Sequence, residues 1–185
     1  MTAQVCARGS LSSDQRWPAR ETTLFFYAGH GLQVAGRNYL IPVDAKLERP
    51  SALGVEAIEV DSILADMETE KRTNLACRDN PLSRSLSRSF GEARSAALGR
   101  GLSPLNAGVG TLITFSTSPN TVALDGAGRN SPFTAALLKH IRTPDIEIRT
   151  MLTRVRTDVV KATNERQLPW DHSSLLGEFY FKRGG

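Results

Sequence analysis

A short apolar run that ends in Gly29-His30-Gly31 constrains the fold of this chain more than any other stretch. Residues 24–28 read Leu-Phe-Phe-Tyr-Ala, and an uninterrupted run of this kind suits a parallel strand that is covered on both faces. The glycines on either side of His30 let the backbone turn sharply and let a ligand approach closely. We therefore expect an imidazole at the carboxyl end of a buried strand, where open α/β sheets place their binding sites.

A second stretch, residues 76–79 (Ala-Cys-Arg-Asp), places a thiol after another short extended segment, residues 73–76. A cysteine close to a histidine can act as a nucleophile with its general base, since the imidazole takes the thiol proton and the thiolate attacks a carbonyl carbon. The positive charge of Arg78 favours the thiolate. We therefore expect His30 and Cys77 to form a catalytic pair. The ordinary alternatives are a turn histidine and a small buried cysteine.

The two stretches also have a characteristic spacing. His30 lies 47 residues before Cys77 (77 − 30), and caspases carry their histidine about 50 residues before a Gln-Ala-Cys motif. On residues 26–31 (Phe-Tyr-Ala-Gly-His-Gly), 76–81 (Ala-Cys-Arg-Asp-Asn-Pro) and 130–134 (Asn-Ser-Pro-Phe-Thr), the chain resembles the caspase-like domain of bacterial metacaspase relatives, in the caspase superfamily of cysteine peptidases. The resemblance extends from about residue 21 to residue 182. It implies a cysteine endopeptidase that works through an acyl-enzyme on a peptide or protein substrate.

The resemblance implies further site residues. The backbone N–H groups of Gly31 and Cys77 would bind the oxyanion of the tetrahedral intermediate, and one such donor contributes on the order of 10²–10³ in rate. Many metacaspase-like enzymes cleave after Arg or Lys and use an acidic pocket, part of which is usually an Asp two residues before the nucleophile. That position is Leu75 here, so the preference for a basic residue stays open. The remaining candidates for substrate binding are three acidic residues and one serine: Asp44, Asp79, Asp125 and Ser116.

Alternating strand and helix patterns predict the fold class, a three-layer α/β/α sandwich with a mostly parallel central sheet, as in caspase-like proteins. One helix is expected after Asp61, with Val60, Ile63, Leu64 and Met67 on its buried face. A second is expected from Pro132 with Ser131 as its cap, and a third is expected to open at Asp145. The expected extended segments are 22–28, 37–42, 57–60, 73–76, 111–116 and 177–182. The apolar stripes of the second and third helices are expected at Phe133, Leu137, Leu138 and Ile141, and at Ile148, Met151, Leu152, Val155, Val159 and Ala162.

The domain organisation follows from composition and from the resemblance. Residues 1–20 are polar and without periodicity, so we expect them to be irregular or disordered. Residues 21–185 are interpreted as a partial caspase-like domain, with a large-subunit-like part (21–77), a flexible linker loop rich in Ser, Arg, Gly and Ala (78–110), and a small-subunit-like part (111–185). Caspase-like domains normally start with two strands before the Gly-His-Gly element, so the first strands are expected to be missing. The strand 22–28 would then form an exposed sheet edge suited to self-association.

Composition and charge exclude several other classes. The formal net charge is +4 and the pI is near 9.4, but the basic residues are spread along the chain, so no nucleic-acid partner is expected. An RNA- or DNA-associating domain using the Arg/Ser stretch 83–100 is kept as a weaker alternative. Neither a signal peptide nor a membrane-spanning run is visible, which favours a cytoplasmic protein without membrane contact. We expect no cofactor and no metal site, with a calcium requirement left open because some metacaspases use calcium.

The main alternative is a catalytically inactive caspase-like interaction module or fragment. The seven residues 22–28 would span about 23 Å as a strand, whereas the four residues 73–76 would span only about 13 Å. Cys77 would therefore either lie deeper in the sheet than His30 or need residues 70–72 as additional strand. Because attack on a peptide bond requires reacting atoms roughly 3–3.5 Å apart, such an offset would favour the inactive alternative.

Overall fold

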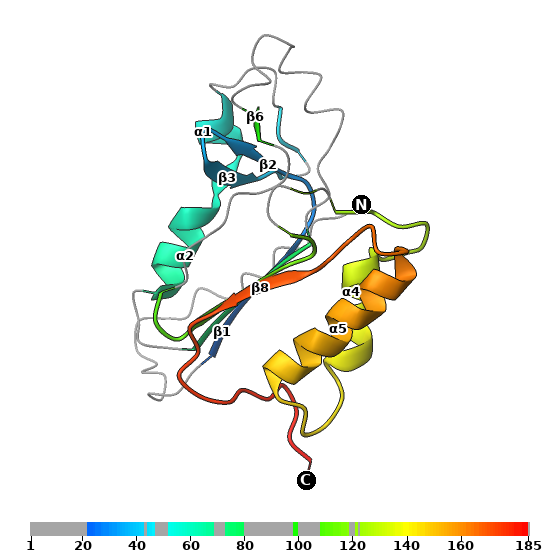
Figure 1. The fold of residues 1–185 in the computed structure, drawn as a ribbon. Helices are drawn as coiled ribbons and strands as arrows, with labels where there is room; N and C mark the ends of the chain where they lie inside the picture. Colours follow the sequence, from blue (N-terminus) through cyan, green and yellow to red (C-terminus); the bar gives the residue numbers. More distant parts are fainter. Residues whose placement is uncertain are drawn as a thin grey trace.

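The central element is a four-stranded sheet. The structure is a computed structural model that describes residues 22–42, 44–46, 52–68, 73–79, 98–99, 108–118, 121 and 123–184. The strands of this sheet are β1 (Thr22–Ala28), β5 (Thr73–Asp79), β7 (Thr111–Phe115) and β8 (Trp170–Ser173), in the order β1-β5-β7-β8 (Figure 1). The pairs β1/β5 and β5/β7 are parallel, and β7/β8 is antiparallel. The predicted mostly parallel sheet is confirmed.

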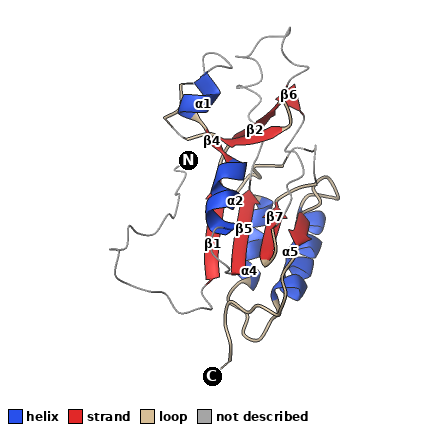
Figure 2. Ribbon diagram, turned by 90° about the vertical axis from the view of Figure 1, so that its left-hand side faces the viewer, coloured by secondary structure: helices blue, strands red, loops and turns tan. Residues whose placement is uncertain are grey.

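Helices cover both faces of this sheet. Figure 2 shows α2 (Val60–Glu68) on one face and α4 (Pro132–His140) with α5 (Ile148–Ala162) on the other. Side chains alternate along the buried strand β7, so Leu112 packs in the core beneath α4 and α5, whereas Ile113 and Phe115 pack in the core beneath α2. The three-layer α/β/α arrangement is therefore confirmed. Within the described parts of the chain, no helix combines the length and the apolar composition that crossing a bilayer requires.

The helix predictions are confirmed in position and corrected at several residues. The buried face of α2 contains Val60, Leu64 and Met67 as expected, but the helix begins at Val60, so Asp61 lies within its first turn and does not precede it. The Oγ of Ser131 accepts a hydrogen bond from the N–H of Thr134 at 3.0 Å, which confirms the cap of α4. Two residues expected on buried stripes are exposed instead, namely Leu138 and Ala162.

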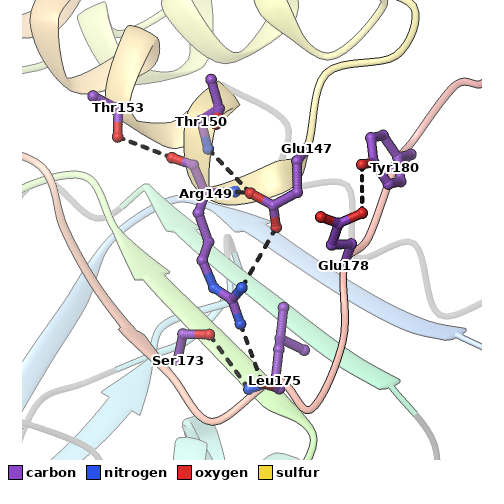
Figure 3. Close-up of polar contacts among 8 residues, drawn as sticks. All are labelled: Glu147, Arg149, Thr150, Thr153, Ser173, Leu175, Glu178 and Tyr180. Atoms are coloured by element: carbon purple, nitrogen blue, oxygen red, sulfur yellow. Dashed lines mark hydrogen bonds and ion pairs between the residues drawn. The ribbon is translucent and has the colours of Figure 1, made fainter.

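The N-terminus of α5 differs from the prediction. The helix begins at Ile148, and the Glu147 carboxylate caps it by accepting hydrogen bonds from the N–H groups of Arg149 (2.8 Å) and Thr150 (3.3 Å) (Figure 3). Asp145, expected to open the helix, instead has a positive φ of 54° and accepts a hydrogen bond from the N–H of Gly184. The helix start therefore lies three residues later than predicted, because Asp145 binds the C-terminal segment.

The expected last strand at 177–182 is wrong. The fourth strand of the main sheet is β8, and the following segment runs past the N-terminus of α5, where the Arg149 side chain donates to the carbonyl of Leu175 at 3.1 Å (Figure 3). Phe179 and Phe181 pack edge to face, with ring centroids 5.1 Å apart, against the core beneath α4 and α5. The alternating stretch 177–182 therefore packs its Phe side chains against the helices and does not form a strand.

A second, smaller sheet was not predicted. It consists of β2 (Gly31–Val34), β3 (Arg37–Leu40), β4 (Ile58–Glu59) and β6 (Leu98–Gly99), all antiparallel, in the order β4-β3-β2-β6. The short helix α1 (Leu53–Glu56) lies beside it at one end of the molecule (Figure 1). Ala35 and Gly36 have φ values of 50° and 81°, which is the backbone of a tight hairpin turn.

The structure describes parts of the expected linker loop 78–110, and the division of the chain at this loop stays a prediction. β6 lies within the expected linker loop 78–110, and β5 continues past residue 77 to Asp79, so these parts of the linker are strands. The remaining linker residues 80–97 and 100–107, like the N-terminal segment 1–20, lie outside the described residues. Among the described strands, β1 is at the edge of the main sheet and pairs with β5. Self-association through this edge stays a prediction.

Candidate active site

The two motif residues lie toward the same end of neighbouring parallel strands. In the β1/β5 register, Phe26 is opposite Cys77 and Ala28 is opposite Asp79, and His30 follows β1 after a bend at Gly29. Both residues are therefore near the carboxyl edge of the parallel part of the sheet, where α/β sheets place their sites. The side chains of Cys77 and Asp79 lie outside the described part of the structure, so the contact between thiol and imidazole stays a prediction.

The length of β5 corrects the prediction of a four-residue strand. β5 has seven residues, and it starts level with β1, since Thr22 is opposite Thr73. Cys77 is therefore level with Phe26, four residues before His30 (30 − 26). Cys77 thus lies deeper in the sheet than His30. A fully extended chain would place four residues about 13 Å farther along the strand. The turn after Ala28 must therefore bring His30 back toward the sheet for the pair to form.

The main chain of His30 is held from two sides. The hydroxyl of Tyr27 donates to the His30 carbonyl at 2.6 Å, and the N–H of Ile41 donates to the same oxygen at 2.9 Å. The side chain of His30 is exposed, whereas that of Tyr27 is only 3% exposed. Gly31 follows as the buried first residue of β2, opposite Leu40. Its role as an oxyanion donor, with the N–H of Cys77, stays a prediction.

The predicted substrate-binding residues come from different loops. Asp44 is exposed in a turn after β3, and Asp125 is exposed in the loop between β7 and α4. Asp79 is the last residue of β5. Ser116 follows β7 directly and is buried, with 2% of its surface exposed. The ends of β5 and β7 bring Asp79 and Ser116 to the carboxyl edge of the sheet, while the structure gives no contact that joins Asp44 or Asp125 to His30.

A buried glutamine that sequence reasoning missed organises the loop after β7. Gln167 is 1% exposed, and its Nε2 donates to the carbonyl of Ser116 at 2.7 Å. Its Oε1 accepts a hydrogen bond from the N–H of Leu124 at 2.9 Å. The Oγ of Ser118 donates to the carbonyl of Leu168 at 3.1 Å. The segment around Gln167 therefore holds Ser116, Ser118 and Leu124, which follow β7 at the carboxyl edge of the sheet.

The strand that follows Gln167 brings an exposed tryptophan to this edge. Trp170 begins β8 opposite Phe115, the last residue of β7, and it is 49% exposed. The side chain of Trp170 is therefore not packed within the core. The Nε of Arg156 donates to the carbonyl of Pro169 at 2.9 Å, and its guanidinium pairs with Asp171. These contacts hold the start of β8 against α5.

The charged cluster at the ends of α4 and α5 lies on the helices and not at this edge. Asp158 lies 2.7 Å from the ammonium of Lys139 and 2.8 Å from the Nε2 of His140. Hydrogen bonds from Lys139, and then from His140, lower the pKa of Asp158. His140, the last residue of α4, thus lies beside a carboxylate of α5. No cluster of His, Cys, Asp and Glu suited to a metal ion occurs among the residues that the structure describes.

Comparison with known proteins identifies the domain. A family model of the caspase domain matches residues 10–180. The crystal structure of caspase-1 from Spodoptera frugiperda is similar in fold, with a TM-score of 0.52 and 19% sequence identity. The match covers 88% of this chain but 63% of that chain, so this chain spans less than two thirds of that caspase. A search of curated proteins finds no match.

Proposed function

Because this chain belongs to the caspase-domain family of cysteine peptidases, we propose that it is an endopeptidase in which Cys77 is the nucleophile and His30 the general base. The observation that carries this proposal is the parallel register of β1 and β5, which brings both family motifs to the carboxyl edge of adjacent strands. The proposal requires the turn at Gly29 to return the imidazole to the level of the thiol.

The proposed reaction follows from the chemistry of the pair. The His30 imidazole takes the proton of the Cys77 thiol, and the thiolate sulfur forms a bond to the carbonyl carbon of the substrate. The N–H groups of Gly31 and Cys77 donate to the oxyanion of the tetrahedral intermediate. When the carbon–nitrogen bond breaks, the imidazolium gives its proton to the leaving amine. Water, deprotonated by His30, then hydrolyses the thioester, and general base catalysis of this kind contributes about 10²–10⁴ in rate.

The acidic residues considered for substrate binding bear on which substrate residue is preferred before the scissile bond. Leu75, two residues before Cys77, is fully buried in the core beneath α4 and α5, so this position binds no substrate side chain. A preference for Arg or Lys would therefore depend on Asp79, Asp125 or Asp44. We propose Arg- and Lys-ended peptides as the first substrates to test, with Trp170 as an apolar contact at the same edge of the sheet.

Site-directed variants and a peptide panel test the function. The wild-type protein should cleave at least one member of a panel that differs only in the residue before the scissile bond, and a thiol-reactive peptidyl probe should label it. Cys77→Ala and His30→Ala should lose cleavage by at least about 10³-fold. Cys6→Ala, which removes the other cysteine, should keep both cleavage and labelling. Labelling that persists in Cys77→Ala would contradict the assignment of the nucleophile.

A second candidate function is a catalytically inactive caspase-like interaction module. The position of Cys77 opposite Phe26, deeper along the sheet than His30, favours it. In that case, the peptidyl probe fails to label the folded protein, and iodoacetamide alkylates Cys77 no faster in the wild type than in His30→Ala. A faster alkylation of the wild type would exclude this candidate, because it shows that the imidazole activates the thiol.

A further inference from the structure

The aromatic ring three residues before His30 is placed rigidly. Tyr27 is 3% exposed and lies in the core beneath α2, together with Leu64 and Met67. A buried tyrosine has only two side-chain torsions, and both are fixed here by the packing of its ring. The position of the Tyr27 hydroxyl at the end of β1 is therefore fixed.

That hydroxyl binds the backbone of the Gly-His-Gly turn. It donates to the carbonyl of His30 at 2.6 Å and lies 3.0 Å from the carbonyl of Ile41. Because Ile41 also donates its N–H to the His30 carbonyl, the end of β1 and the end of β3 are joined through one oxygen atom. The contact is made to the main chain of His30, while its imidazole is exposed at the edge of the sheet.

The same ring explains the glycine before His30. A Cβ added at Gly29 would lie 2.7 Å from the Oη of Tyr27 and 2.9 Å from its Cζ, and real Cβ atoms do not approach other atoms this closely. Any residue other than glycine would therefore displace the ring and lengthen the bond from its hydroxyl to His30. Tyr27, Gly29 and His30 act as one structural unit.

The proposed catalytic pair requires a turn that brings the His30 imidazole to the level of the Cys77 thiol, and this unit lies at that turn. Cys77 is level with Phe26, and an extended chain would carry His30 away from it. The bond from the Tyr27 hydroxyl to the carbonyl of His30 limits how far the chain can extend between these two residues. We propose that Tyr27 is a positioning residue, whose hydroxyl fixes the turn that presents the His30 imidazole to the thiol of Cys77. The inference rests on the proposed peptidase function.

The test compares Tyr27→Phe with Tyr39→Phe. The first removes only the hydroxyl and keeps the ring in the core. The second removes the hydroxyl of a tyrosine in β3 of the smaller sheet, which makes none of the contacts described for His30. We expect Tyr27→Phe to lower kcat about ten- to hundredfold with KM within about twofold, because displacement of a catalytic group by 1 Å can cost 10²-fold. Tyr39→Phe should keep the wild-type kcat.

A second readout does not depend on activity. The chain has three histidines, so the ring signal of His30 in NMR spectra is assigned by its loss in His30→Gln. We expect Tyr27→Phe to shift this signal and to leave those of His140 and His172 in place. If the wild type cleaves no peptide but Tyr27→Phe still shifts the His30 signal, the peptidase function fails and the positioning stands. If the wild type is active and Tyr27→Phe changes neither kcat nor the signal, the positioning is overturned and the function stands.

Gly29→Ala tests in a second way whether kcat depends on the hydrogen bond from the Tyr27 hydroxyl. It should lower kcat in the wild-type background because the new Cβ displaces the Tyr27 hydroxyl. In the Tyr27→Phe background the hydroxyl bond is already gone and only the close contact with the ring remains, so the further loss of kcat should be smaller. Two losses that multiply as independent effects would refute the coupling of these residues.

Discussion

Replacement of the buried Gln167 by leucine removes two hydrogen bonds while nearly preserving side-chain volume. The carbonyl of Ser116 loses the 2.7 Å bond from Nε2, and the N–H of Leu124 loses the 2.9 Å bond to Oε1. Ser116 is 2% exposed, so water does not replace the lost donor without a change in the packing. We expect Gln167→Leu to fold with the same secondary structure and a lower free energy of unfolding.

The size of the effect follows from these two bonds. Loss of the donor at the buried carbonyl of Ser116 costs about 1–3 kcal/mol, and loss of a bond at the half-buried N–H of Leu124 costs about 0.5–1.5 kcal/mol. The sum is centred on about 3 kcal/mol. For a chain of 185 residues, each kcal/mol lowers the midpoint of thermal unfolding by about 2–4 °C. Gln167→Leu should therefore lower the midpoint by roughly 6–12 °C.

Urea denaturation and thermal unfolding, followed by circular dichroism, measure this difference. The matched control is Leu168→Ala, a change at the adjacent residue, whose side chain is 44% exposed. The control should remain within about 0.5 kcal/mol of the wild type. A Gln167→Leu variant that is as stable as Leu168→Ala would refute the reasoning, because it would show that the two backbone groups find other partners.

Two further predictions concern the helices beside the sheet. Hydrogen bonds from Lys139 and His140 lower the pKa of Asp158, so its contribution to stability is present above the ordinary carboxyl pKa of about 4 and is lost as the pH falls through the lowered value. Because the side chains of Asp158 and Lys139 are 30% and 65% exposed, this contribution to the free energy of unfolding is below about 1 kcal/mol. Between about pH 6 and pH 2.5, the midpoint of urea denaturation should therefore fall less steeply in Asp158→Asn than in the wild type. Equal slopes would contradict the pairing. Ser131→Ala removes the hydrogen bond to the N–H of Thr134 and should cost about 1 kcal/mol in urea denaturation, whereas Ser131→Asp, which keeps an acceptor, should restore most of the loss.

Elements with a strong local pattern could be predicted from the sequence. The apolar runs of β1 and β7 and the helical stripes of α2 and α5 are each local patterns, and Ser131 with Pro132 marks a helix start. β5 was predicted too short because the polar residues after Cys77 are typical of a loop. Its central position supplies backbone partners on both sides as far as Arg78, and β1 alone extends the strand to Asp79, which is opposite Ala28.

The elements that were missed depend on contacts distant in sequence. The small sheet pairs Val34 with Leu98, and a two-residue strand leaves no periodic pattern. Residue types identified His30 and Cys77 as candidates, but not the side chains that hold the loops around them. Tyr27 and Gln167 act on backbone carbonyl and N–H groups, which are present at nearly every position, so no motif marks their targets.

The pairing of β5 with β7 has a consequence for the integrity of the chain. These two neighbours lie on opposite sides of residues 80–97, and the carboxylate of Glu68 and the N–H of Asn74, which precede this stretch, bind Gly108 and Gly110, which follow it. A protease that cleaved the polypeptide within 80–97 would therefore leave two fragments that stay associated through the hydrogen bonds between β5 and β7. Such a clipped molecule should migrate as one species on a native gel and as two bands after denaturation.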